Sequence, residues 1–242
     1  MRTITISPGS EFTDSDHPTR TKKDAKDLFP QDEQIRLVIE EGITEIGWGS
    51  FAGCDNLVSV VIPGSLKTYP GYAFPHCPNL NSVIVSNGVK KIGNMDFYCC
   101  SGMTALVLPD SLDEIGERAF FNCARLASLV IPPHVTSIGL DAFKNCGALT
   151  SLEFREDPSR TFSDDLDRLA HSCSIDCGAF KGCKGLTSIV FPDRISYISE
   201  YAFYGCTNLS SVRLSPDTRV LKDAFCKCPC EESIRTGRNN NY

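Results

Sequence analysis

The sequence lacks several features that assign a function directly. Among 242 residues there are one tryptophan, three methionines and four histidines, and 24 lysines and arginines against 30 aspartates and glutamates leave a net charge of −6. Mild acidity without a long basic run argues against nucleic acid as the main partner. No apolar run approaches the ~18–20 residues of a membrane-spanning helix, so we expect no membrane insertion. Residues 1–10 also lack the apolar stretch of ~7–15 residues found in a secretory signal.

Catalytic motifs are missing as well. His17, His76, His134 and His171 have no Asp or Ser partner at a spacing typical of a catalytic triad. The chain has no GxGxxG run after a strand and no glycine-rich loop ending in Gly-Lys-Ser or Gly-Lys-Thr that would cradle a phosphate. We therefore expect a protein that is not an enzyme and that needs no cofactor.

Cysteine, in contrast, is abundant, with 13 residues. Eight of them recur 23 residues apart, with one spacing of 37 and one of 22: Cys54, Cys77, Cys100, Cys123, Cys146, Cys183, Cys206 and Cys228. A phenylalanine stands three residues before each: Phe51, Phe74, Phe97, Phe120, Phe143, Phe180, Phe203 and Phe225. Alanine precedes that phenylalanine except at Ser50 and Asp96. A fixed period of this kind is the signature of stacked structural repeats.

Each repeat contains the pattern of a short strand. Apolar residues alternate six and eight positions after the cysteine, as in Leu129 and Ile131. One unit has too few apolar residues to enclose a core, but units stacked at about 4.8 Å form continuous internal columns. The sequence therefore predicts a β-rich solenoid of 23-residue repeats over residues 35–230. We expect about eight coils, with parallel strands on one face and turns or short helices on the other.

The repeat resembles a known family. Its order, Leu-x-x-apolar-x-apolar-Pro followed by Ile-Gly-x-x-Ala-Phe-x-x-Cys, is similar to the BspA-like, or treponemal-type, leucine-rich repeat, most clearly over residues 115–138 and 198–214. The resemblance implies a curved scaffold for protein–protein contact, often an adhesin at a cell surface. It implies no catalytic residues.

Three segments do not follow the repeat. Residues 1–34 are predicted to be a polar N-terminal tail, in which 21–29 form either a short capping helix or part of a disordered terminus. The extra residues of the long spacing lie near 156–170 and form either a binding loop or a tolerated excursion. Residues 231–242 are predicted to be a disordered C-terminal tail.

The repeating cysteines are interpreted as small buried hydrophobic residues. Stacked positions lie about 4.8 Å apart, whereas the two Cβ atoms of a disulfide lie ~3.5–4.5 Å apart, so we expect reduced thiols. This favours an intracellular location, with the cell surface as the alternative. Cys226, Cys228 and Cys230 are candidate metal ligands, but their CxCxC spacing and the missing fourth ligand favour no metal.

The face of the sheet that points away from the core is the candidate partner-binding site. Residues seven positions after each cysteine, with one in the leading strand, form what we call the outward row: Val38, Val61, Ile84, Val107, Val130, Glu153, Val190 and Arg213. An exposed apolar stripe marks interaction sites, although β-branched residues also favour strands for their own sake. We predict a non-enzymatic scaffold that binds a protein partner through the outward row. The alternative is a cell-surface adhesin exported by a signal not present in this chain.

Overall fold

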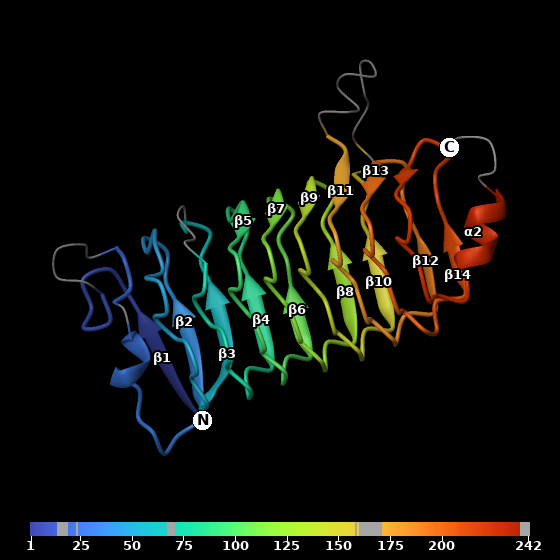
Figure 1. Cartoon of the computed structure of the whole chain (residues 1–242). Coiled ribbons are helices and arrows are strands. Elements are labelled where there is room, and N and C mark those ends of the chain that lie inside the picture. The colour runs from blue at the N-terminus through green and yellow to red at the C-terminus, as the bar shows by residue number, and fades with distance from the viewer. Residues whose placement is uncertain (14–18, 23, 67–70, 158, 160–170, 238–242) are drawn as a thin grey trace.

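The chain winds into an elongated solenoid with residues 2–6 at one end and residues 231–237 at the other (Figure 1). The computed structural model describes residues 1–13, 19–22, 24–66, 71–157, 159 and 171–237. Parallel strands lie side by side along one face, and they are β1 (Arg2–Ile6), β2 (Ile35–Ile39), β3 (Leu57–Ile62), β4 (Ser82–Val85), β6 (Ala105–Val107), β8 (Ser128–Ile131), β10 (Ser151–Phe154), β12 (Ser188–Val190) and β14 (Ser211–Arg213). The predicted solenoid of 23-residue coils is confirmed.

A second parallel sheet runs along another side of the coils. It contains β5 (Lys91–Ile92), β7 (Glu114–Ile115), β9 (Ser137–Ile138), β11 (Cys173–Ile175), β13 (Ile195–Ile198) and β15 (Arg219–Val220). We predicted only turns or short helices away from the main sheet. Short strands form here because Ile92, Ile115 and Ile138 are fully buried and pair with one another from coil to coil. The sheet is the main feature that the sequence analysis missed.

The third side of each coil is the Ala-Phe-x-x-Cys turn. The residues two before and two after each phenylalanine have a positive φ, as at Arg118 (51°) and Asn122 (57°). The N–H groups of Arg118, Phe120 and Asn122 each donate a hydrogen bond of 2.8 Å to a carbonyl of the next coil. The left-handed residues therefore let alternate N–H groups point along the solenoid axis, which pairs backbone groups that would otherwise be buried without partners.

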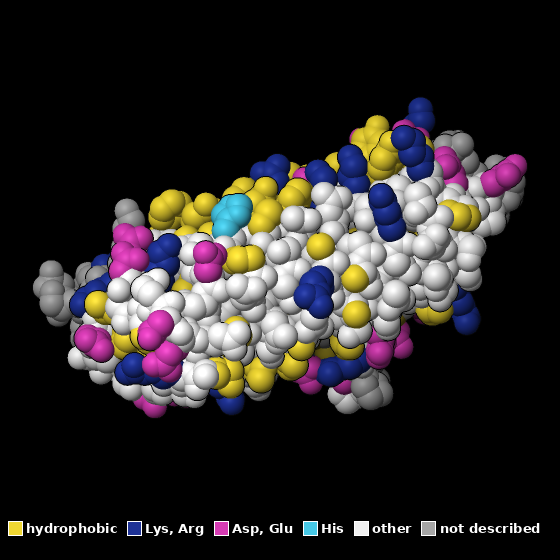
Figure 2. Space-filling view, turned by 90° about the horizontal axis from the view of Figure 1, so that it is seen from below, with side chains coloured by type: hydrophobic (Ala, Val, Ile, Leu, Met, Phe, Trp, Pro, Cys, Tyr) yellow, Lys and Arg dark blue, Asp and Glu magenta, His cyan; other side chains and the backbone are white. Residues whose placement is uncertain are grey.

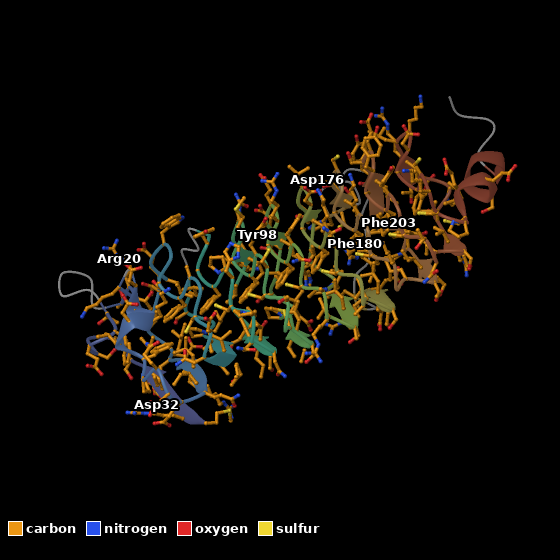
Figure 3. The ribbon with its side chains drawn as sticks, turned by 60° about the horizontal axis from the view of Figure 1, so that its bottom comes forward. Arg20, Asp32, Tyr98, Asp176, Phe180 and Phe203 are labelled. Carbon is orange, nitrogen blue, oxygen red and sulfur yellow. The ribbon has the colours of Figure 1, made fainter. Side chains whose placement is uncertain are left out.

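The phenylalanines form one continuous column inside the coils. From Phe51 to Phe225, neighbouring ring centroids lie 5.0–5.4 Å apart and the ring planes are parallel within 8°. Phe180 and Phe203 are labelled in this column in Figure 3. The spacing between Phe143 and Phe180, which the insertion separates in sequence, is 5.3 Å. The coils on either side of the insertion therefore stack without a gap.

The repeating cysteines do more than fill space. Each Sγ after the first donates to the carbonyl of the phenylalanine one coil before, at 3.0–3.4 Å. Phe97, for example, accepts from the Cys100 N–H of its own coil and from the Cys123 Sγ of the next. All 13 cysteines are free thiols, and burial raises the pKa of Cys146 to about 12. Such thiols are unreactive near neutral pH.

Asp96 and Ser50 stand where the other coils have alanine before the column phenylalanine. Both side chains form hydrogen bonds to backbone groups. The fully buried Asp96 carboxylate accepts from the Ala73 N–H at 3.2 Å and from the Gly93 N–H at 2.5 Å. Burial holds the pKa of Asp96 well above its usual range. Ser50 is also fully buried, and its hydroxyl lies 2.8 Å from the Thr21 hydroxyl.

The N-terminal residues are more ordered than predicted. Residues 2–6 of the expected polar tail form β1, which pairs with β2, because Ile4 and Ile6 alternate toward the core. The helix expected over 21–29 is a shorter 3₁₀ turn, η1 (Ala25–Leu28). Phe29 covers the first coil by stacking 5.8 Å from Phe51. The N-terminal segment is therefore part of the solenoid and caps it.

The C-terminal end is covered by a helix, α2 (Glu231–Gly237), where we predicted a disordered tail. Ile234 packs against the core and Cys230 is buried, which explains why this segment is ordered. Residues 238–242, residue 158 and residues 160–170, which include most of the expected insertion, lie outside the described residues. Within the described part of the chain, no helix is long and apolar enough to cross a membrane.

Candidate protein-binding face

The outward row follows the solenoid axis in three hydrogen-bonded segments, Val38 to Val107, Val130 to Glu153, and Val190 to Arg213. Val38 pairs in register with Val61, Val61 with Ile84, and Ile84 with Val107. Glu153 pairs with Val130, and Val190 pairs with Arg213. The period of two in each strand and the equal coil lengths together produce this alignment.

Exposure within the outward row varies along the molecule. The exposed fractions are 40% for Ile84, 54% for Val107, 42% for Val130 and 63% for Val190. Glu153 and Arg213 are exposed, whereas Val38 and Val61 are half-buried. Val38 lies between Thr5 of β1 and Val61 of β3. The apolar stripe is therefore most open over β4, β6 and β8.

A parallel row of small side chains borders the stripe. Its members lie two residues before those of the outward row, and they are Ser59, Ser82, Ala105, Ser128, Ser151, Ser188 and Ser211. Small side chains leave the backbone accessible to a partner. Hydrophobic side chains gather along both long edges of the view in Figure 2, so the apolar surface of the molecule is not confined to one face.

The C-terminal part of the same face is hollowed and charged. Glu153, Arg155, Val190, Asp193 and Arg213 are among the residues that line a hollow over β10, β12 and β14. Arg155 contacts Asp110. Among the described residues, neither Glu153 nor Arg213 forms an ion pair. These two charges flank Val190 within the outward row.

A second exposed feature lies on the turn side and was missed by the sequence analysis. The residues that follow five of the column phenylalanines form a half-buried row, Tyr98, Phe121, Lys144, Lys181 and Tyr204. Tyr98 stacks on Phe121 at 4.8 Å, and the Lys181 ammonium lies 4.9 Å from the Tyr204 ring centroid. Tyr98 is labelled near this edge in Figure 3. The signal was present in the sequence as an aromatic or lysine residue after Phe97, Phe120, Phe143, Phe180 and Phe203.

The face formed by the short strands carries paired charges instead. Lys90 lies 3.3 Å from Asp113, and Lys91 lies 2.7 Å from Glu114. Lys90 and Lys91 therefore each have an acidic neighbour one coil away, and this part of the face is charge-balanced. A partner would find fewer side chains without an existing contact on this part of the face than on the outward row.

The candidate metal ligands are differently placed. Cys228 and Cys230 are buried, and Cys226 is half-buried. The Cys228 Sγ donates to the Phe203 carbonyl at 3.0 Å, as its counterparts do in other coils. Among the residues that the structure describes, no group of three or more His, Cys, Asp and Glu side chains is arranged to hold a metal ion.

The histidines lie in separate places. The His76 ring packs against the edge of Tyr98 at 5.3 Å, and the His134 Nε2 lies 3.8 Å from the Asp157 carboxylate. His17 lies outside the described residues, and His171 is half-buried beside the insertion. The structure thus brings His134 next to an acid, a pairing that the sequence analysis did not identify.

The stacked coils and internal columns define a solenoid of the leucine-rich repeat class. The sequence model of the BspA type leucine rich repeat region matches residues 25–156 and 168–242 in six copies, so the chain belongs to this family. Membership indicates a repeat scaffold of the protein-interaction or adhesin type, a class that is generally non-enzymatic.

Solved structures of bacterial leucine-rich repeat proteins are similar to this chain. A protein from Bacteroides ovatus is 28% identical with a TM-score of 0.62, and the match covers 76% of this chain and 44% of that one. A T. pallidum leucine-rich repeat protein is 25% identical with a TM-score of 0.57, over 76% of this chain and 84% of that one. The chain thus spans less than half of the Bacteroides ovatus protein. No curated protein matches it.

Proposed function

We propose that the chain is a non-enzymatic scaffold that binds a protein partner through the outward row of its long strands. The observation that carries this proposal is the exposed apolar side chain that each of the successive long strands β4, β6 and β8 presents, at Ile84, Val107 and Val130. Isolated exposed apolar residues are common on protein surfaces, but a contiguous stripe is a feature of interaction sites. Covering the exposed part of Ile84, Val107 or Val130 contributes about 1 kcal/mol each, at ~25 cal/mol per Å² of apolar surface buried.

The other two sides of the coils support the choice of this face. The short-strand face has its lysines paired with acidic neighbours, as at Lys91 and Glu114. The turn side already places its aromatic rings against one another, as at Tyr98 and Phe121. The outward row combines exposed apolar side chains with small neighbours and lies across adjacent strands that form a regular surface.

A charge introduced into the stripe tests the proposal. Val107→Asp changes an exposed side chain in a strand, so we expect the free energy of unfolding to fall by only about 1 kcal/mol, from lower strand propensity and the lost contact with Ile84. The same change places a carboxylate inside a desolvated contact, so we expect capture of the partner to fall at least about tenfold. Affinity capture followed by mass spectrometry measures this effect.

Ala148→Asp is the matched control. Ala148 is exposed and lies two residues after Cys146, outside the outward row, and the substitution adds the same charge. We expect it to retain the partners that Val107→Asp loses. Recovery of the same partners by wild type and Val107→Asp would contradict the proposal.

A further inference from the structure

The outward row is not the same at its two ends. From Val38 to Val130 it is apolar, and beyond β8 it continues with Glu153, Val190 and Arg213. A partner that covers the whole row therefore meets apolar side chains, then a carboxylate, then a valine, then a guanidinium. Neither charged group forms an ion pair within the described part of the chain, so both are available to a partner.

This order argues against a second copy of the chain as the partner. A two-fold symmetric contact pairs each position of the row with its mirror position about a centre. If the two-fold axis passes through Ile84, the two copies cover each other's apolar stripe. Glu153 then lies opposite Thr5 of the other copy, and Arg213 is left uncovered. A centre at Val190 pairs the two charges but leaves most of the apolar stripe open. One symmetric arrangement cannot satisfy both parts of the row.

The spacing of the row indicates the conformation of the partner. Successive coils lie about 4.8 Å apart. An α-helix along the axis presents one side chain per turn of about 5.4 Å, a drift of about 0.6 Å per coil. An extended strand presents one side chain to a given face every ~6.6–6.8 Å, so it loses register within two coils. A helix centred on the row and parallel to it departs from the coil positions by only about 2 Å at either end, so it can place one side chain against each coil.

We infer that the partner lays an amphipathic α-helix along the outward row, with a basic residue opposite Glu153 and an acidic residue two turns further on, opposite Arg213. The inference rests on the proposed function and specifies its partner. Eight positions at about 4.8 Å span about 34 Å, and eight side chains at one per turn require a helix of about 26 residues. The intervening turn carries an apolar residue against Val190.

Synthetic helices supply the probe. The first peptide has about 26 residues, with one apolar residue per turn for five turns, then Lys, an apolar residue and Glu on the same face. The second peptide has the Lys and Glu exchanged, so its composition and net charge are identical. Each peptide is made in both chain directions. Fluorescence anisotropy measures the dissociation constants of labelled peptides for the wild-type chain. In at least one chain direction, we expect the first peptide to bind about tenfold more tightly than the second, because two partly exposed ion pairs are gained.

A charge-exchanged chain provides the reciprocal test. Glu153 and Arg213 are exposed surface residues, so the double variant with Glu153→Lys and Arg213→Glu is expected to fold. We expect it to bind the second peptide more tightly than the first. Apolar contact alone cannot reverse the preference between the two peptides, because the apolar stripe and the peptides are the same in both experiments.

The outcomes separate this inference from the proposed function. Val107→Asp is expected to abolish binding of both peptides. The two peptides could bind the wild type equally and both fail to bind Val107→Asp. This result would overturn the predicted order of charges on the partner but would leave the outward row as a binding face. Failure of both peptides to bind the wild type would overturn the helical partner, and the capture experiment would still test the face. Sedimentation that shows a wild-type dimer disrupted by Val107→Asp would overturn the inference in favour of a second copy.

Discussion

The inside and the outside of a coil follow different rules, and Phe120 and Phe121 show the contrast in adjacent residues. Phe120 is fully buried and stacks 5.2 Å from Phe97 and 5.0 Å from Phe143. Phe121 is half-buried and stacks on Tyr98, and the next residue in its row is Lys144 rather than another ring. The inner position repeats the same residue in each coil, whereas the outer position varies. Stacking constrains the interior, and the exterior is free to acquire binding properties.

The outward row shows the same freedom on the strand side. Leu129 and Ile131 of β8 are buried, while Val130 between them is exposed. Its counterpart one coil further on is Glu153, although the inner neighbours remain Leu152 and Phe154. A change of function along the molecule therefore requires no change in the core.

The largest difference between inside and outside is expected for the two phenylalanines. Phe120→Ala removes a ring from the middle of the column and should lower the free energy of unfolding by about 3–5 kcal/mol. Phe121→Ala removes one half-buried stacking partner and should cost about 0.5–1.5 kcal/mol. Urea denaturation of both variants measures the contrast. Equal losses would mean that the column does not carry the stability of the solenoid.

Asp96 is an interior exception whose cost depends on pH. Its folded-state pKa is raised by burial, so its contribution to stability is fully present below the unfolded pKa of about 4 and is lost as the pH rises. Asp96→Asn removes this titration. We expect the variant to gain stability relative to wild type between pH 4 and pH 7, by about 1.4 kcal/mol for each pKa unit of the shift within that window.

Denaturation of both proteins at the two pH values measures the gain. Any change in stability from the asparagine side chain that does not depend on pH cancels in this comparison. It cancels when the stability difference between variant and wild type at pH 4 is subtracted from the difference at pH 7. A relative stability that does not change with pH would contradict the buried position of the carboxyl group.

The positive-φ positions of the turns can be tested with two glycines. A Cβ added at Gly205, whose φ is 72°, or at Gly147 meets no atom within 4 Å, and the φ of Gly147 is not in the left-handed region. Gly205→Ala should cost about 1–2 kcal/mol because an L residue is strained there. Gly147→Ala should be neutral or stabilise by up to about 1 kcal/mol. Thermal unfolding measures both variants. If both substitutions shift the unfolding temperature in the same direction, the left-handed conformation assigned to Gly205 would be contradicted.

The cysteine hydrogen bond is expected to have a smaller effect. Cys123→Ala removes a buried sulfur and its bond to the Phe97 carbonyl and should cost about 1–1.5 kcal/mol. Cys99 is half-buried on the outside of the neighbouring coil, and Cys99→Ala should cost less than about 0.5 kcal/mol. Chemical denaturation under reducing conditions compares them. If both cost the same, neither the packing nor the hydrogen bond of the buried Cys123 thiol would contribute measurably to stability.

The main features of the fold could be predicted because the interior repeats. The recurrence of phenylalanine and cysteine determines the coil length, and the alternation around residues such as Val130 determines which side chains point inward. The second sheet was missed because strands of two residues, such as Lys91–Ile92, are too short to show an alternating pattern. The terminal elements were missed for another reason: β1 and α2 carry neither the phenylalanine nor the full repeat.

The positive-φ positions left a signal that the sequence analysis did not use. Glycine recurs two residues after the column phenylalanine at Gly53, Gly182 and Gly205, and asparagine occurs there at Asn122 and Asn145. These are the residues that adopt the left-handed conformation most readily. The role of cysteine as a donor could not be deduced, because it depends on the distance between a thiol and a carbonyl of a different coil.

The candidate site was only partly accessible to sequence reasoning. The outward row could be predicted because strand alternation sets the direction of each side chain. Its uneven exposure, with Val38 half-buried and Val107 open, depends on which strands lie beside each position. The hollow around Glu153 and Arg213 depends on how β10 and β12 meet at the insertion, which no local pattern describes.

Hydroxyl-radical footprinting of the complex with the captured partner tests the binding face most directly, because it reads the exposure of individual side chains. We predict that oxidation of Ile84, Val107 and Val130 falls on binding, while that of Trp48 and Tyr201, which lie on the turn side, stays unchanged. Protection of Trp48 and Tyr201 with no change at Val107 would show that the partner binds the turn side and would contradict the account.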